Sequence, residues 1–136
     1  MDPKKFFSLS DKDLVTILES YWLEEISGRH RELSSMQAAE MIRTVKGLII
    51  ARMANLKPPF LPGQKVRVLS EPIQSRYGPK VTLAPGSVHT IKMVIFKPDY
   101  LKWCLQLEGV GLPDRPATFL ADKFSKMRVR SNIHAA

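Results

Sequence analysis

The residues of this chain that could carry chemistry are one cysteine and three histidines, His30, His89 and His134. Cys104 has no histidine nearby in the sequence, so a thiolate nucleophile activated by a base is not indicated. The histidines lie far apart, without a second cysteine or paired carboxylates at ligand spacing, which argues against a zinc site. Gly109-Val110-Gly111 has no helix after it to hold a phosphate. The sequence therefore predicts a protein that is not an enzyme and needs no cofactor or metal.

Positive charge is the second chemical feature, and it is concentrated in the C-terminal half. The 136 residues carry 21 Lys and Arg against 13 Asp and Glu, a formal net charge of +8. Residues 1–61 hold nine basic against eight acidic side chains, and residues 62–136 hold twelve against five, so +7 of the excess lies there. Such a balance indicates a polyanionic partner, nucleic acid above all. Small soluble proteins that bind no nucleic acid can also be basic, and both interpretations stay open.

Basic and apolar residues alternate in two short segments. Lys65 and Arg67 alternate with valines, and the cations at 126, 128 and 130 alternate with Met127 and Val129. If the apolar residues face a core and the first and last strands pair, five cations share one outer face, and nearby Tyr77 can stack on a base. The alternative is that these cations only protect strand edges. The predicted nucleic-acid-binding residues are Lys65, Arg67, Arg76, Tyr77, Lys80, Lys126, Arg128 and Arg130.

Two helices are predicted to precede these segments and to form a helical hairpin over residues 1–57. Ser10 followed by Asp13 is a capping pattern, and apolar residues at helical spacing then predict a helix over about 10–28. A wide apolar stripe predicts a second helix over about 35–55, which the prolines at 58 and 59 end. Residues 1–7 carry no periodic apolar pattern, so they are expected to be poorly ordered.

Residues 60–130 are predicted to form a small closed barrel of five β-strands. Alternating or apolar runs indicate strands over 64–69, 87–96 and 100–108, with a short strand at 81–83 and a bulge near Lys92. Residues 109–116 read as a loop, after which a short apolar strand, one turn and a last alternating strand close the barrel. The linker at 57–63 is expected to separate the helices from the barrel, and residues 131–136 are expected to be a flexible tail.

The C-terminal half contains five segments of turn and core residues: Phe60-Leu61-Pro62-Gly63, Val66-Arg67-Val68, Pro85-Gly86-Ser87-Val88-His89-Thr90-Ile91, Leu107-Glu108-Gly109-Val110 and Phe119-Leu120-Ala121-Asp122-Lys123-Phe124. With this succession it resembles small SH3-like barrel proteins of bacteriophage and mobile-element genomes. The resemblance implies a five-stranded SH3-like β-barrel and a viral or mobile-element origin, and it brings no catalytic residue with it. The helical hairpin lies outside the match. Together, the hairpin and the barrel predict an α+β fold.

Two functions from different classes follow. The first is a nucleic-acid-binding accessory module, in which the basic face holds phosphates and the helices dimerise or contact a second protein. The second is a protein-protein interaction module, such as a phage-type inhibitor or adaptor, whose partner surface includes Tyr77, Phe96, Tyr100 and the helices. A lone cysteine and the lack of a signal sequence or long apolar segment predict a cytoplasmic protein with no membrane partner. A homo-oligomer is compatible with either function.

Overall fold

The computed structural model describes residues 3–27, 35–112 and 115–127 of the chain, and it has an α+β fold. Three helices come first: α1 (Pro3–Ser8), α2 (Asp11–Ser27) and α3 (Ser35–Met53). They are followed by β1 (Lys65–Val68), β2 (Ile73–Gln74), β3 (Thr82–Leu83), β4 (Val88–Lys97), β5 (Lys102–Leu112), β6 (Arg115–Leu120), the 3-10 helix η1 (Ala121–Lys123) and β7 (Phe124–Lys126). Within these ranges, none of the helices has the length and hydrophobicity of a membrane-spanning segment.

Five of the strands form an antiparallel sheet in the order β6-β5-β4-β1-β7, and β2 and β3 form a separate two-stranded ladder. β1 and β7 are the first and last strands along the chain, and they pair as the sequence predicts, with Val68 opposite Phe124. The predicted closed barrel is not formed, because β6 and β7 stay at opposite edges of the sheet. The free edge of β6 pairs instead with the loop after β2, where Tyr77 bridges to Thr118.

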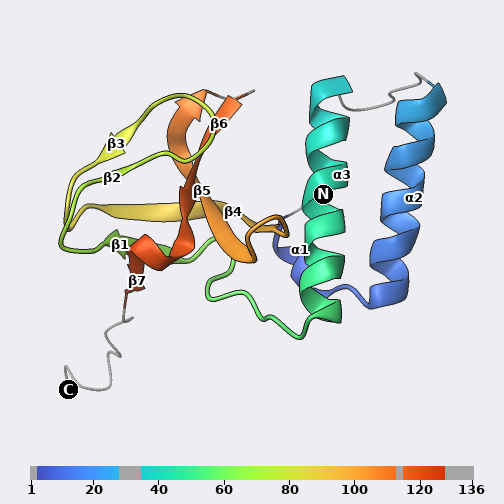
Figure 1. The fold of residues 1–136 in the computed structure, drawn as a ribbon, viewed down its shortest axis with the longest axis horizontal. Helices are drawn as coiled ribbons and strands as arrows, with labels where there is room; N and C mark the ends of the chain where they lie inside the picture. Colours follow the sequence, from blue (N-terminus) through green and yellow to red (C-terminus); the bar gives the residue numbers. More distant parts are fainter. Residues whose placement is uncertain (1–2, 28–34, 113–114, 128–136) are drawn as a thin grey trace, which may run out of the picture.

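The helices cover one side of the sheet in two layers. In Figure 1, α3 lies beside the sheet and α2 runs antiparallel along the outer side of α3. The Oγ of Ser10 accepts a hydrogen bond from the backbone N–H of Asp13 at 3.1 Å, so the predicted cap is present. Both helices start and end within two residues of their predicted bounds. The predicted connection between them, residues 28–34, lies outside the described residues.

A shared core joins the helices to the sheet, so the expected separation by the linker is wrong. Leu14 of α2 and Val45 of α3 belong to the same buried cluster as Met93 and Ile95 of β4. The four consecutive residues from Met93 to Phe96 are all buried. Because neighbouring strand residues point to opposite faces, β4 must be covered on both faces, by α3 on one and by the sheet's own core on the other.

The N-terminal segment also differs from its prediction. Residues 3–8 form α1, and Phe6 is 2% exposed within the cluster that joins the helices to β4. The segment is therefore anchored by one large apolar side chain. A single buried residue gives no periodic pattern, which is why the sequence predicts disorder there.

The predicted loop at 109–116 is mostly strand. β5 continues to Leu112 and β6 begins at Arg115, with Gly111 opposite Pro116 and Leu112 opposite Arg115. The glycines at 109 and 111 have positive φ angles of 70° and 92°, and the register shifts between Gln106 and Gly111. These glycines therefore belong to an irregular stretch of a hairpin, where such residues often mark a bulge.

Candidate functional site

The predicted basic face is formed only in part. Lys65 and Arg67 are exposed and alternate with buried Val66 and Val68, as predicted. Lys126 is also exposed, but it lies opposite Val66 in the β1–β7 ladder. Because directly opposed residues of an antiparallel pair share a face, Lys126 lies on the other face of this ladder from Lys65 and Arg67.

Lys126 was predicted to share a face with Lys65 and Arg67 because Met127 was expected to point into the core. Buried Phe124 lies opposite buried Val68, which sets the phase of β7 one residue away from the predicted phase. The backbone N–H of Met127 donates to the carbonyl of Lys65 at 3.4 Å, so these two residues lie side by side. Arg128 and Arg130 lie outside the described residues.

Arg76 and Tyr77 lie elsewhere, in the loop between β2 and β3, which docks on the edge of β6. Both backbone N–H groups donate to the carbonyl oxygen of Thr118, at 2.6 Å and 3.3 Å, and the N–H of Thr118 donates to the carbonyl of Tyr77 at 3.0 Å. In the sheet order, β6 is at the opposite end from β7. The structure therefore divides the predicted residues into a strand group on β1 and β7 and a loop group next to β6.

The loop that carries Arg76 and Tyr77 is closed by its own hydrogen bonds. Ser75 Oγ donates to the carbonyl of Pro79 at 2.7 Å and accepts from the N–H of Val81 at 3.0 Å. Gly78 has a φ of +79°, and a Cβ atom there would clash with the carbonyl oxygen of Pro116. The position therefore requires glycine for both its backbone angle and its close approach to β6.

Two tyrosines and two cations meet beside this loop, and we call Arg76, Tyr77, Lys97 and Tyr100 the aromatic-cation cluster. The rings of Tyr77 and Tyr100 have centroids 6.5 Å apart and planes within 22°, and their hydroxyl groups are hydrogen-bonded to each other. The Arg76 guanidinium carbon lies 6.0 Å from the Tyr100 ring centroid, and Lys97 Nζ lies 4.8 Å from the Tyr77 centroid. The loop before β3 thus supplies Arg76 and Tyr77, the last residue of β4 is Lys97, and the turn after β4 supplies Tyr100.

The aromatic-cation cluster carries a net positive charge. Within the described ranges, neither Arg76 nor Lys97 forms an ion pair, and each lies over a tyrosine ring, an arrangement that favours a cation. Burial, and then the hydrogen bond with Tyr77, raise the pKa of Tyr100 above its ordinary value. Tyr100 therefore stays neutral at physiological pH, and the charge of both cations remains available to an anionic ligand.

A pocket of about 470 Å³ lies next to the cluster. Arg76 lines it and also contacts Tyr100, so the pocket and the cluster are continuous. On the η1 side the pocket is lined by Asp122 and Lys123, and Lys102 Nζ lies 3.3 Å from Asp122 Oδ2. The remaining lining residues are 69–75 and Leu120.

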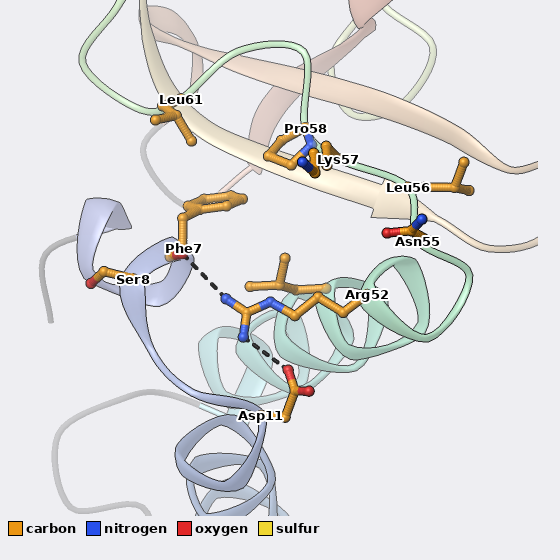
Figure 2. Close-up of a pocket in the computed structure, with 10 residues that line it drawn as sticks. Phe7, Ser8, Asp11, Arg52, Asn55, Leu56, Lys57, Pro58 and Leu61 are labelled. Carbon is orange, nitrogen blue, oxygen red and sulfur yellow. Dashed lines mark hydrogen bonds and ion pairs between the residues drawn. The ribbon is translucent and has the colours of Figure 1, made fainter.

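A second pocket, of about 460 Å³, lies where α1, the end of α3 and the following segment meet. Figure 2 shows Arg52 reaching from α3 to the carbonyl of Phe7, at 3.2 Å, and to the carboxylate of Asp11, at 3.0 Å. Its guanidinium also donates to the carbonyl of Leu9. Arg52 thus fastens α1 and the start of α2 to α3, and we assign it a structural role.

The cysteine and the described histidine also have structural surroundings. Cys104 is buried, its Sγ lies 3.9 Å from the Tyr100 hydroxyl, and burial raises the pKa of its thiol, which favours the unreactive form. His89 is half-buried beside Ser87, and burial lowers its pKa. Within the described ranges, no three His, Cys, Asp or Glu side chains come together as metal ligands. His30 and His134 lie outside those ranges.

Sequence reasoning missed Lys97 and misplaced Phe96. Phe96 is 1% exposed and packs edge-to-face on Trp103 at 5.0 Å, so it cannot belong to the predicted partner surface. Lys97 follows it and reaches Tyr77 instead. The sequence signal that could have indicated this contact is the placement of Lys97 and Tyr100 on either side of the Pro98-Asp99 turn. Lys80 is exposed, as predicted.

Comparison with known proteins finds no similar chain. No family model matches, and neither a curated protein nor a solved structure is similar to it.

Proposed function

We propose that this protein is a non-enzymatic nucleic-acid-binding module that uses the basic surface of its sheet half. The observation that carries the proposal is the aromatic-cation cluster, in which two tyrosine rings and two cations without ion pairs within the described residues lie together. Nucleic acid offers phosphates to cations and flat bases to aromatic rings.

The charge around the cluster supports the same proposal. Residues 62–127 contain ten described lysines and arginines, and within the described part of the chain only Lys102 among them has an ion pair. The strand group, Lys65, Arg67 and Lys126, therefore adds exposed positive charge that is free to attract phosphates. We propose that the strand group makes additional phosphate contacts on longer nucleic acids, and that the aromatic-cation cluster is the centre of binding.

We further propose that the sheet is an open variant of the SH3-like barrel. The strand order β6-β5-β4-β1-β7, with η1 leading into the last strand, supports this proposal. A viral or mobile-element origin is part of the same proposal and rests on the sequence resemblance alone. Fold likeness of this kind carries no function with it, so the proposed nucleic-acid binding depends on the residues of the site.

Charge reversal at the cluster tests the proposed function. The variant Arg76→Glu/Lys97→Glu should weaken binding to a labelled oligonucleotide by at least about tenfold, since a charged hydrogen bond contributes about 1.5–3 kcal/mol. The control Lys12→Glu/Lys46→Glu changes the net charge equally at exposed positions of α2 and α3. Equal loss in both variants would show that net charge alone matters and would contradict a site at the cluster.

A different observation favours the second candidate function, a protein-interaction module. Trp22 and Leu23 of α2 are 57% and 67% exposed, and Val15, seven residues before Trp22, is also exposed. This spacing places them on one side of the helix, an apolar face that a protein partner could cover. Light scattering and affinity capture with the wild type and Trp22→Glu/Leu23→Glu test this function. Loss of an assembly in the variant, with oligonucleotide binding unchanged, would favour it.

A further inference from the structure

We infer that the aromatic-cation cluster binds single-stranded nucleic acid through unpaired bases, an inference that rests on the proposed function and narrows it. In a duplex, the flat faces of the bases are covered by their neighbours, and only base edges and phosphates can be reached. A tyrosine ring can stack only on a base that has left its stack. Cations alone would serve for a duplex, so the paired rings of Tyr77 and Tyr100 are the feature that points to a single strand.

The Tyr77 ring is exposed, the Tyr100 ring is half-buried, and both are held in place. Tyr77 is 39% exposed, although its backbone is fixed to Thr118 by hydrogen bonds in both directions. The hydroxyl bond between Tyr77 and Tyr100 fixes the rings relative to each other. A rigid aromatic surface loses little conformational entropy when a base stacks on it, which favours binding of a flexible strand.

The cations lie where a strand would need them. Each base of a strand is flanked by two phosphates, and the cluster has one cation against each ring, Arg76 on Tyr100 and Lys97 on Tyr77. A nucleotide stacked on either ring therefore brings its phosphates close to a cation. The cluster thus joins sequence-tolerant stacking to contact with the backbone.

The adjoining pocket has the size and the polar groups to take a base. Its volume of about 470 Å³ accommodates a small planar group, and Arg76 connects it to the rings. Glu71 and Asp122 line it together with Arg76 and Lys123, so its wall offers both acceptors and donors to the hydrogen-bonding edge of a base. Only a nucleotide free of its pairing partner can turn its base into such a pocket, which again favours a single strand.

The test compares two forms of nucleic acid on the full-length protein. A labelled mixed-sequence single strand of about 12 nucleotides and a hairpin duplex with the same number of phosphates are titrated at the same low salt concentration. We expect the single strand to bind at least about fivefold more tightly, because stacking of one base on an aromatic ring increases affinity by at least about this factor. Tyr77→Leu should remove most of this preference without weakening duplex binding. Tyr77→Phe, which keeps the ring, should retain it.

The outcomes separate this inference from the proposed function. If the wild-type protein binds both forms with equal affinity, the single-strand inference is wrong, whereas the proposed nucleic-acid binding is retained. This comparison needs no variant. Binding of neither form removes the proposed function itself. Polyglutamate of the same charge serves as a competitor without bases. If it displaces the single strand as effectively as unlabelled oligonucleotide does, the site recognises charge rather than bases, and the inference is wrong.

Discussion

Gly47 of α3 lies directly against the backbone of Phe96 in β4, so that a Cβ atom on Gly47 would clash with the carbonyl oxygen of Phe96. No side chain separates the helix from the strand at this point. The contact brings α3 close enough for Val45 and Leu48 to share a core with Met93 and Ile95. Helices and sheet therefore form one structure, although their sequences read as two.

We predict that Gly47→Ala destabilises the protein. In an open helix interior this change stabilises by about 1 kcal/mol. Here overpacking against a strand backbone should outweigh that gain and lower the free energy of unfolding by about 1–3 kcal/mol. Urea unfolding measures the change, and Lys46→Ala at the neighbouring exposed position should stay within about 0.5 kcal/mol of wild type. An increase in stability for Gly47→Ala would show that α3 does not lie this close to β4.

Phe6→Ala should be as damaging as a mutation in the centre of the sheet. Phe6 is almost completely buried in the cluster between the helices and β4, and emptying such a site costs about 3–5 kcal/mol. Thermal or urea unfolding checks this, with exposed Leu23→Ala expected to change stability by less than about 0.5 kcal/mol. Wild-type stability in Phe6→Ala would mean that the N-terminal segment is not part of the core.

The raised pKa of Tyr100 predicts a loss of stability at alkaline pH. Above about pH 10 the unfolded chain ionises this phenol while the folded chain keeps its proton, so the unfolded state is favoured increasingly as the pH rises. Below that pH both states are protonated and the contribution is constant. Tyr100→Phe cannot ionise there, and its stability should fall less steeply than that of wild type between pH 10 and 11. Parallel curves for the two proteins would contradict burial of the Tyr100 hydroxyl.

Local patterns predicted α2, α3 and most of the strands, but not α1, β2 or the strand residues within 109–116. Of the contacts between distant elements, the pairing of β1 with β7 was expected and is present. The Ser10 cap and the alternation at β1 depend on neighbours in the sequence, and both are present. The register of β4 and β5 also shifts between Ile91 and Met93, where a bulge near Lys92 was predicted. The docking of α3 on β4 was not predicted. Its signal was the unbroken apolar run from Met93 to Phe96, which is typical of a strand covered on both faces.

The candidate site was predictable only in pieces. Arg76 and Tyr77 were predicted to be binding residues from their types. Their neighbours, however, depend on the docking of the loop on Thr118, a long-range contact that leaves no local pattern. The prediction that Lys65 and Lys126 share a face was wrong, because the register of the short strand β7 is set by its buried residue, Phe124. Side-chain types thus indicated which residues could contact phosphates and bases, whereas the grouping of these residues depends on the fold.

The dependence of oligonucleotide affinity on salt concentration tests whether this protein binds nucleic acid through its cations. If exposed cations of the sheet half hold phosphates, a plot of log affinity against log salt for the wild-type protein should fall with a slope of about 3–5, roughly one unit for each phosphate neutralised. Arg76→Glu/Lys97→Glu should reduce that slope by about two units if each cation holds one phosphate. A flat plot, or no binding even at low salt, would contradict nucleic-acid binding by this protein.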